Sequence, residues 1–338
     1  THGLNSIVVD MKDDMGRITY DTDLELPKQM NGLLNQVVIK DLVDLAHKNG
    51  IYVIGRVVVF KDRKLFYFDK SRHALWDFKS QRGWGNFFKV ENEETDEATW
   101  EQREFWLDPF DPFVWDYNIS VAKELQDKGI DEIQFDYIRF PSDGDLSTAQ
   151  YRYRREGQTK IEALESFLRK ARESITIPIS TDLYGFNCYF RMGNWIGQSV
   201  EYLSRYVDVI SPMFYPSHFP RDFMQKEQYL PRAKKIYLEG SNRAAALAAG
   251  RSLIRPYVQA FLLGGELDFD TATYSDYLVK QLEGTKESEA SGFTLWNNSN
   301  KYYMVKQSLL GYTGLKPKPG TLRPDAAMIQ PVNTTELE

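Results

Sequence analysis

The chain has 338 residues, a length that accommodates one large domain or two ordinary ones. Its hydrophobic content of 42% and charged content of 27% are typical of globular proteins and argue against long disorder. The formal net charge of −6 argues against a nucleic-acid binder that works by neutralising phosphates. No apolar run reaches the roughly 18 residues that a membrane span needs.

The histidine, cysteine and aromatic residues give further information on the class of protein. The histidines are His2, His47, His73 and His218, and their spacing excludes an H-E-x-x-H zinc hydrolase. The single cysteine, Cys188, cannot form a disulfide within the chain. Aromatic residues reach 14%, which fits either a large aromatic core or a cleft that stacks flat ligands such as sugar rings.

Short β-branched runs alternate with longer amphipathic stretches. The predicted strands are Ile7–Lys12, Ile51–Phe60, Glu132–Phe140, Ile177–Tyr184, Val207–Tyr215, Ile254–Leu262 and Gly292–Asn297. A weak further candidate is Phe105–Pro109. This alternation favours a parallel sheet with helical crossovers.

Helix start and stop signals lie between several of these strands. Asp111 and Pro112 read as an N-cap and a first-turn residue, and Gly129 as the stop. The stripe predicted to be buried in this helix is Trp115, Ile119, Ala122 and Leu125. Further helices are predicted over Gln36–Asn49 and Lys160–Ser174.

We interpret the pattern as a (β/α)8 TIM-type barrel over residues 1–312. No G-x-G-x-x-G follows the first strand, which argues against an open dinucleotide-binding sheet. The eighth strand is either Phe105–Pro109 or a first strand upstream of Thr1. Residues 61–111 are too long for an ordinary connection and are predicted to form an insertion at the barrel mouth. The proline-rich residues 313–338 are predicted to form an extended tail.

Polar residues recur on one face of several predicted strands. Gln134 and Asp136 alternate with Ile133, Phe135 and Tyr137, and the apolar set should face the helices. The same division turns Asp10, Lys12, Ser180 and Asp182 inward, and an interior Lys12–Asp10 ion pair is the structural alternative. Arg56 is the lone charge in its strand. Buried strands that carry no functional residues are normally continuous hydrophobic runs. The polar residues on this face therefore indicate a site at the barrel mouth.

Two carboxylates in this set suit acid–base chemistry. Asp136 and Asp182 end successive strands, and neighbouring strands lie about 4.8 Å apart. Their carboxyl groups could then stand within the roughly 5–5.5 Å of a retaining glycosidase or the 6.5–9.5 Å of an inverting one. Arg56, Lys12 or Arg139 would hold one of them ionised.

Other chemistries have less support. The chain has no G-x-S-x-G elbow and no P-loop. Cys188 follows a strand end, but no histidine is expected beside it. Asp13 and Asp14 lack the rest of a calcium loop. A metal-dependent phosphoesterase or deacetylase would need a metal at Asp10, Asp13 and Asp136, and no metal or other cofactor is predicted.

The chain resembles a bacterial family of glycoside-hydrolase-like TIM-barrel domains. The resemblance covers most of the chain in order and is most specific in FDYIRFP and SPMFYPSH. It rests on VVDMKDDMG (8–16), GIYVIGRVVVFKD (50–62), WLDPFDPFVWDYN (106–118), GIDEIQFDYIRFP (129–141), SPMFYPSHF (211–219), RPYVQAF (255–261) and GFTLWNNSNKY (292–302).

Such domains are similar to α-amylase-type and α-galactosidase-type barrels, which implies roles for particular residues. The resemblance makes Asp136 the nucleophile at the end of the fourth strand, and Asp182 the general acid/base at the end of the fifth. It also places a first strand upstream of Thr1. This chain departs from the family pattern at Tyr257 and Ala260, where tryptophan and aspartate often stand, so an activity that needs a carboxylate at Ala260 is in doubt.

The sequence therefore predicts a glycoside hydrolase that acts on a polysaccharide, most simply with retention, at the bacterial cell envelope or outside the cell. The alternative is a glycan-binding barrel of an envelope protein that does not catalyse. No nucleic-acid partner is expected. The predicted substrate-binding residues are Asp10, Lys12, Arg56, Arg139, Tyr184, Tyr215, His218, Tyr257, Gln259 and Trp296.

Overall fold

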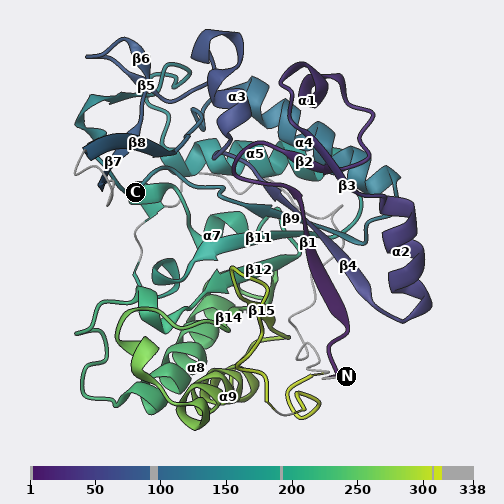
Figure 1. The fold of residues 1–338 in the computed structure, drawn as a ribbon, viewed down its shortest axis with the longest axis vertical. Helices are drawn as coiled ribbons and strands as arrows, with labels where there is room; N and C mark the ends of the chain where they lie inside the picture. Colours follow the sequence, from purple (N-terminus) through teal and green to yellow (C-terminus); the bar gives the residue numbers. More distant parts are fainter. Residues whose placement is uncertain (1–2, 92–97, 191–192, 307, 314–338) are drawn as a thin grey trace. The chain divides into compact units, whose positions relative to one another are not determined.

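The computed structural model describes residues 3–91, 98–190, 193–306 and 308–313. Contacts within the chain divide it into unit 1, Thr1–Ser199, and unit 2, Val200–Glu338 (Figure 1). None of the helices in the described ranges combines the length and the apolar character needed to cross a membrane. Apart from Thr313, the predicted tail over 313–338 lies outside the described residues.

Unit 1 is built on a mostly parallel sheet. The strand order is β11-β9-β4-β1-β2-β3; β1, β4, β9 and β11 run parallel, and β2 is antiparallel to β1. The strands of this sheet are β1 (Ser6–Lys12), β2 (Ile18–Tyr20), β3 (Leu33–Val37), β4 (Tyr52–Val58), β9 (Glu132–Asp136) and β11 (Ile179–Tyr184).

Crossover helices connect the parallel strands of unit 1, as the alternation in the sequence predicts. The helix α4 leads from β4 to β9, and α5 leads from β9 to β11. The α-helices of the unit are α1 (Glu25–Gln29), α2 (Ile39–Lys48), α3 (Arg63–Tyr67), α4 (Pro112–Asp127), α5 (Lys160–Ser174) and α6 (Gly193–Ile196). Short 3-10 helices are η1 (Phe68–Ser71), η2 (Leu146–Thr148) and η3 (Gly185–Cys188).

The start and stop signals of α4 are confirmed, and α5 has the predicted bounds, Lys160–Ser174. The Asp111 side chain accepts a hydrogen bond from the Phe113 N–H, and Pro112 opens α4. Gly129 has a φ of 97°, the left-handed conformation that ends a helix at low cost. The predicted stripe of α4, Trp115, Ile119, Ala122 and Leu125, is buried.

The two faces of the sheet differ as predicted. The register aligns Asp10 with Arg56, Arg56 with Gln134, and Gln134 with Ser180, so one row of polar residues crosses four neighbouring strands. On the other face Phe135 packs edge-on against Phe167 of α5, with ring centroids 5.1 Å apart. The apolar face therefore meets the helical layer. Lys12 departs from the predicted division: the register of β1 and β4 shifts between Asp10 and Lys12, and the Lys12 Nζ lies 5.4 Å from the centre of the Tyr117 ring of α4.

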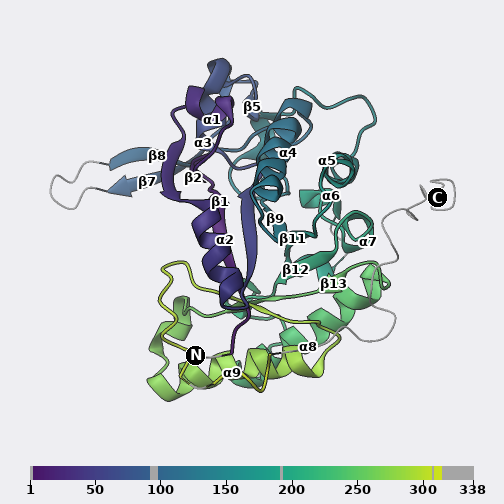
Figure 2. The ribbon, with the colours of Figure 1, turned by 90° about the vertical axis from the view of Figure 1, so that its right-hand side faces the viewer.

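Residues 61–111 form an excursion that returns to its starting point. The Asp62 N–H donates to the Phe105 carbonyl and the Leu107 N–H to the Phe60 carbonyl, so the two ends run antiparallel. Phe105–Pro109 is therefore not a strand of the main sheet: Trp106 and Leu107 make only isolated bridges, to Lys61 and Ala74. Figure 2 shows the hairpin β7–β8 projecting from the rest of unit 1. The small strands are β5 (Trp76–Asp77), β6 (Arg82–Gly83), β7 (Asn86–Glu91), β8 (Ala98–Glu104) and β10 (Ala149–Gln150).

Unit 2 repeats the combination of parallel strands and helices. Within it β14 pairs in parallel with β12 and β15, and β13 pairs with β12. The long helices α8 and α9 lie side by side (Figure 2). The elements are α7 (Val200–Leu203), β12 (Val209–Met213), η4 (Pro216–His218), α8 (Tyr229–Ala248), β13 (Leu253–Ile254), β14 (Tyr257–Gln259), η5 (Gly264–Asp268), α9 (Thr271–Glu287) and β15 (Thr294–Trp296).

Most of the predicted strands are one or two residues longer at one or both ends than the observed ones, and for three elements the difference has a local reason. The strand predicted over Glu132–Phe140 ends at Asp136, because Tyr137 has a φ of 51° and leaves the extended conformation. The strand predicted over Ile254–Leu262 is divided into β13 and β14 at Pro256, which has no N–H to pair. The helix predicted from Gln36 begins only at Ile39, since β3 pairs with β2 as far as Val37.

The contact between α8 and α9 depends on Gly284. A Cβ atom at this position would stand 2.2 Å from the Lys234 carbonyl oxygen of α8, so even a methyl group forces the helices apart. We expect Gly284→Ala to lower the free energy of unfolding by about 1–3 kcal/mol despite the better helix propensity of alanine, as measured by urea denaturation. The control is Gly311→Ala, where a Cβ atom meets nothing within 4 Å. Equal stability of the two variants would contradict this packing.

Candidate active site

Asp136 is the last residue of β9, and both of its carboxylate oxygens accept hydrogen bonds. Oδ2 accepts from Arg56 Nε at 3.0 Å and from Nη2 at 2.5 Å. Oδ1 accepts from the Tyr137 N–H at 2.6 Å. The side chain is 11% exposed, so it reaches the surface of the site in a fixed orientation. Such a carboxylate is preorganised for a reaction at a defined atom.

Arg56 bridges two carboxylates. Its Nη1 donates to Asp10 Oδ1 at 2.7 Å, while Nε and Nη2 donate to Asp136. Since β4 lies between β1 and β9, this one guanidinium links three adjacent strands. The sequence suggested Arg56, Lys12 or Arg139 as the cation beside a carboxylate, and it is Arg56 that binds Asp136.

Asp182 lies on the strand next to Asp136. The paired register of β9 and β11 ends with Phe135 opposite Thr181, and the next residues of the two strands are Asp136 and Asp182. The Asp182 side chain is buried, with the residue 2% exposed. Tyr184, two residues further, is half-buried and meets Trp195 edge-on at 6.2 Å. The strand pairing that underlies the two-carboxylate hypothesis is therefore present within unit 1.

Lys12 has a partner other than Asp10. Its Nζ lies 2.7 Å from Asp62 Oδ2, and both side chains are 0% exposed. It also donates to the Val58 carbonyl at 2.7 Å and lies 5.4 Å from the centre of the Tyr117 ring. The suggested Lys12–Asp10 ion pair is thus wrong: Asp10 is taken by Arg56. A buried lysine in this position is inaccessible to a ligand and supports the end of β4.

The turn after Asp136 is packed under the returning end of the insertion. Arg139 lies over the Trp106 ring at 4.8 Å and over the Tyr137 ring at 5.4 Å. Lys61 lies 5.0 Å from the centre of the Tyr137 ring. Burial and then the negative charge of Asp136 raise the pKa of Tyr137, so its hydroxyl stays neutral. Arg139 also donates to Ser142 Oγ at 3.2 Å. Through Lys61 and Trp106, the insertion therefore restrains the turn that follows the nucleophile candidate.

Asp108 is a second unusual carboxyl group, at the returning end of the insertion. It is fully buried and accepts from the Phe110 and Tyr153 N–H groups. Burial, helped by the nearby charge of Asp111, raises its pKa to about 6. Asp108 does not follow a strand of the main sheet, and we assign it a structural role.

In unit 2, the loops after β12 and β14 are joined by Gln259. Its Oε1 accepts from the Ser217 N–H at 3.2 Å and Oγ at 3.0 Å, and its Nε2 donates to Glu266 Oε2 at 2.7 Å. Gln259 is 0% exposed, so its amide positions neighbours instead of facing solvent. Burial raises the pKa of Glu266, which also accepts from the Tyr277 hydroxyl.

The remaining predicted residues of unit 2 form aromatic contacts. Tyr215 meets His218 edge-on at 5.4 Å. Partial desolvation lowers the pKa of His218, although its side chain still reaches solvent, so the imidazole is neutral at pH 7. Tyr257 meets Trp296 edge-on at 6.2 Å; Tyr257 is buried and Trp296 half-buried. Ala260, just after β14, is fully buried.

Other candidates from the sequence do not gather into a site. Among the described residues, no three His, Cys, Asp or Glu side chains are grouped so as to hold a metal ion. Cys188 is buried, at 3% exposure. Within the insertion Trp84 and Trp106 belong to the core, whereas Trp100 is 66% exposed on β8. The aromatic excess thus serves both the core and the surface.

Sequence reasoning missed Asp62, Tyr137 and Glu266. Asp62 precedes Arg63 and caps α3, and this N-cap pattern was a usable signal. Tyr137 was assigned to a strand, and nothing in its residue type indicates a positive φ. Glu266 lies in a short polar segment without a periodic pattern.

A family model described as "Putative glycosyl hydrolase domain" matches residues 1–302 of this chain. No curated protein gives a significant match.

A solved glycoside hydrolase domain shares the fold. The PgaB (BpsB) glycoside hydrolase domain from Bordetella bronchiseptica is similar at 13% identity over 93% of this chain and 99% of its own, with a TM-score of 0.54. A hypothetical protein from Ruminiclostridium thermocellum is 31% identical over 53% of this chain and 84% of its own, with a TM-score of 0.43. The likeness to the Bordetella domain concerns the fold, and with the parallel strands and crossover helices it gives the predicted class, a (β/α)8 barrel type.

The Lys12–Asp62 pair can be tested through stability. Lys12→Met leaves the Asp62 charge buried without its cation, so we expect the free energy of unfolding to fall by about 3–5 kcal/mol in urea denaturation. Adding Asp62→Asn removes that charge and keeps the oxygen that caps α3, so the double variant should regain part of the loss. A loss below about 1 kcal/mol in the single variant would mean that the pair is not buried in solution.

Asp108 predicts a dependence of stability on pH. Because its folded pKa is raised to about 6 from the usual 3.8, the folded state holds the proton more tightly than the unfolded chain. Stability from this group is complete below about pH 4 and is lost as the pH rises through about 6. Relative to Asp108→Asn, wild-type unfolding free energy should fall by about 3 kcal/mol over this window in urea titrations. A constant difference between the two proteins would rule out the raised pKa.

Proposed function

We propose that this chain, which belongs to the glycosyl hydrolase domain family that matches residues 1–302, hydrolyses glycosidic bonds of a polysaccharide with Asp136 and Asp182. The observation that supports this most is the hydrogen-bonded carboxylate of Asp136 at the end of β9, with the buried Asp182 on β11, the strand that pairs with β9. Paired carboxylates on adjacent strand ends are the arrangement that glycoside hydrolysis requires.

The proposed mechanism divides the work between the two groups. Asp136 attacks the anomeric carbon while Asp182 protonates the departing glycosidic oxygen, so the C–O bond breaks as a glycosyl ester forms. Asp182 then takes a proton from water, which attacks the same carbon and releases Asp136. If the reaction inverts, Asp136 instead takes the proton from the attacking water.

Arg56 would serve this chemistry as a positioning residue. Its two bonds to Asp136 Oδ2 leave the carboxylate no freedom to rotate, and the Tyr137 N–H holds the other oxygen. A nucleophile that is already oriented does not have to be ordered in the transition state. Asp10, 47% exposed at the side chain, offers an open oxygen acceptor beside it for a sugar hydroxyl.

The other predicted residues have different roles in this proposal, according to their exposure. Arg139, Tyr184, His218 and Trp296 are half-buried or exposed and remain proposed substrate contacts. Tyr215 is 7% exposed and would act through its contact with His218. Lys12, Gln259 and Tyr257 are buried and would act by supporting their neighbours. A location at the bacterial envelope or outside the cell stays a prediction of the sequence resemblance.

The test is the loss of hydrolysis in Asp136→Asn and Asp182→Asn. Each should lower the rate of product release by roughly 10²–10⁴-fold while the circular dichroism spectrum is unchanged. Products released from a panel of polysaccharides are identified by mass spectrometry with wild-type protein first, and the substrate found there is used for the variants.

The matched control is Asp127→Asn, which makes the same chemical change at an exposed position at the end of α4. It should retain wild-type rates. Near-wild-type hydrolysis by either site variant would overturn its assignment. Binding of a polysaccharide without any product from wild-type protein would replace the proposal by the glycan-binding alternative.

A further inference from the structure

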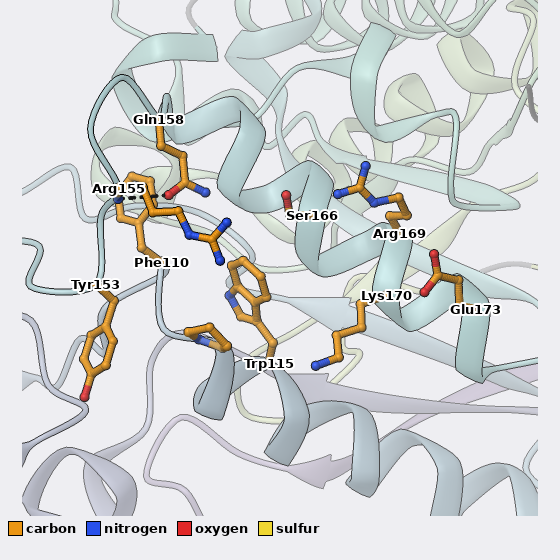
Figure 3. A pocket seen from close by; sticks show the side chains of 10 residues that line it. Phe110, Trp115, Tyr153, Arg155, Gln158, Ser166, Arg169, Lys170 and Glu173 are labelled. Carbon is orange, nitrogen blue, oxygen red and sulfur yellow. Dashed lines mark hydrogen bonds between the residues drawn. The ribbon is translucent and has the colours of Figure 1, made fainter. Parts of the chain in front are cut away.

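Unit 1 contains a cavity away from the polar face of its sheet. It lies between the start of α4, the loop at 151–159 and the exposed side of α5, and its volume is about 320 Å³ (Figure 3). This is the lower end of the range for small-ligand sites. Because α5 packs against the Phe135 face of β9, the cavity belongs to the helical layer and is separate from Asp136.

The charge of the cavity is opposite to that of the chain. Arg155, Arg169 and Lys170 line it against a single carboxylate, Glu173. The whole chain has 48 acidic and 42 basic residues, so the excess of basic over acidic side chains in the cavity is opposite to the excess in the whole chain. Lys170 is paired with Asp116, whereas no ion pair holds either guanidinium among the described residues of the chain. The two arginines are therefore the groups available to an anion.

The loop geometry directs Arg155 into the cavity. The Gln158 carbonyl accepts from Arg154 Nε at 2.8 Å, and its Oε1 accepts from the Arg155 N–H at 3.2 Å. These bonds close the loop on itself. Figure 3 shows the Arg155 side chain directed toward the indole of Trp115.

The opposite wall is aromatic. Trp115 donates its Nε1–H to the Pro109 carbonyl at 2.9 Å, which fixes the ring; the residue is 9% exposed, so only a small part of the indole borders the cavity. Tyr153 and Phe110 complete this wall, and the hydroxyl of Ser166 lies on the α5 side. A flat apolar surface beside hydrogen-bonding groups suits a sugar ring better than a bare inorganic ion.

We propose that this cavity is a non-catalytic binding site for a sugar residue that carries an anionic group, a carboxylate or a phosphate. The ring packs at the exposed part of Trp115, and the anion binds the guanidinium groups of Arg155 and Arg169. The cavity holds one such residue, so a longer chain would continue into solvent.

The experiment measures binding by isothermal titration calorimetry to the full chain carrying Asp136→Asn, so that no probe is hydrolysed. The probes are trigalacturonate, glucose 6-phosphate, neutral maltotriose and inorganic phosphate. We expect an anionic sugar to bind, and to bind less tightly as salt is raised. Tighter trigalacturonate binding identifies a carboxylated glycan as the ligand, and tighter glucose 6-phosphate binding a phosphorylated sugar.

Variants separate the site from general surface charge. Arg155→Ala and Arg169→Ala should each weaken binding of that probe by about tenfold or more, because each removes a charge-assisted contact. Arg221→Ala makes the same change at an exposed residue outside the cavity lining and should leave binding unchanged. Both arginines of the cavity are exposed, so the fold should persist in either variant.

Three results would overturn the proposal. These are no binding of either anionic sugar, equal binding of maltotriose, or inorganic phosphate binding as tightly as glucose 6-phosphate. Failure here is distinct from failure of the hydrolase assignment, because Arg155→Ala and Arg169→Ala in an otherwise wild-type chain should leave hydrolysis of a short neutral substrate unchanged.

Discussion

The guanidinium of Arg56 is the interaction on which the candidate site depends. A charge on a central strand is costly unless it is paired and hydrogen-bonded, and here three of its nitrogens donate to two carboxylates. The same contacts tie β1, β4 and β9 together at their carboxyl ends. Removing the cation would leave Asp10 and Asp136 with adjacent, uncompensated charges. Each charged residue of the polar face therefore needs its partners on the neighbouring strands. This explains why polar residues recur at matching positions of these strands.

A second layer of contacts acts on the backbone that follows Asp136. Tyr137 is held in a left-handed conformation that a non-glycine residue adopts only at some cost, typically about 1–3 kcal/mol. The packing of Trp106, Arg139 and Lys61 around it supplies the compensating contacts. This strained turn presents the Tyr137 N–H to Asp136 Oδ1. Local strain and the orientation of the carboxylate thus have a common cause.

Alternation of apolar and polar residues was sufficient to predict the parallel strands, α4, α5 and the face that carries Asp136. These features follow from periodicity and capping, which are local properties. The partner of Lys12 was not predictable, because Asp62 lies beyond the end of β4 and meets Lys12 only through the pairing of β1 with β4. The early end of β9 and the division at Pro256 depend on single backbone angles and on a missing N–H. The cationic cavity was not predictable, because Arg155 lies in a loop and Arg169 in a helix, and no sequence pattern indicates that they line one cavity.

The antiparallel closure of residues 61–111 has a consequence for how such a domain changes over time. Phe60 and Leu107 are bonded to each other whatever lies between them, so the ends of the excursion stay a fixed distance apart. Residues between them can be lengthened, shortened or exchanged while the strands beneath keep their register. The exposed hairpin β7–β8 belongs to this replaceable part, whereas Trp106 and Lys61 belong to the fixed part. The length of the excursion and the geometry of the carboxylates can therefore change separately within one chain.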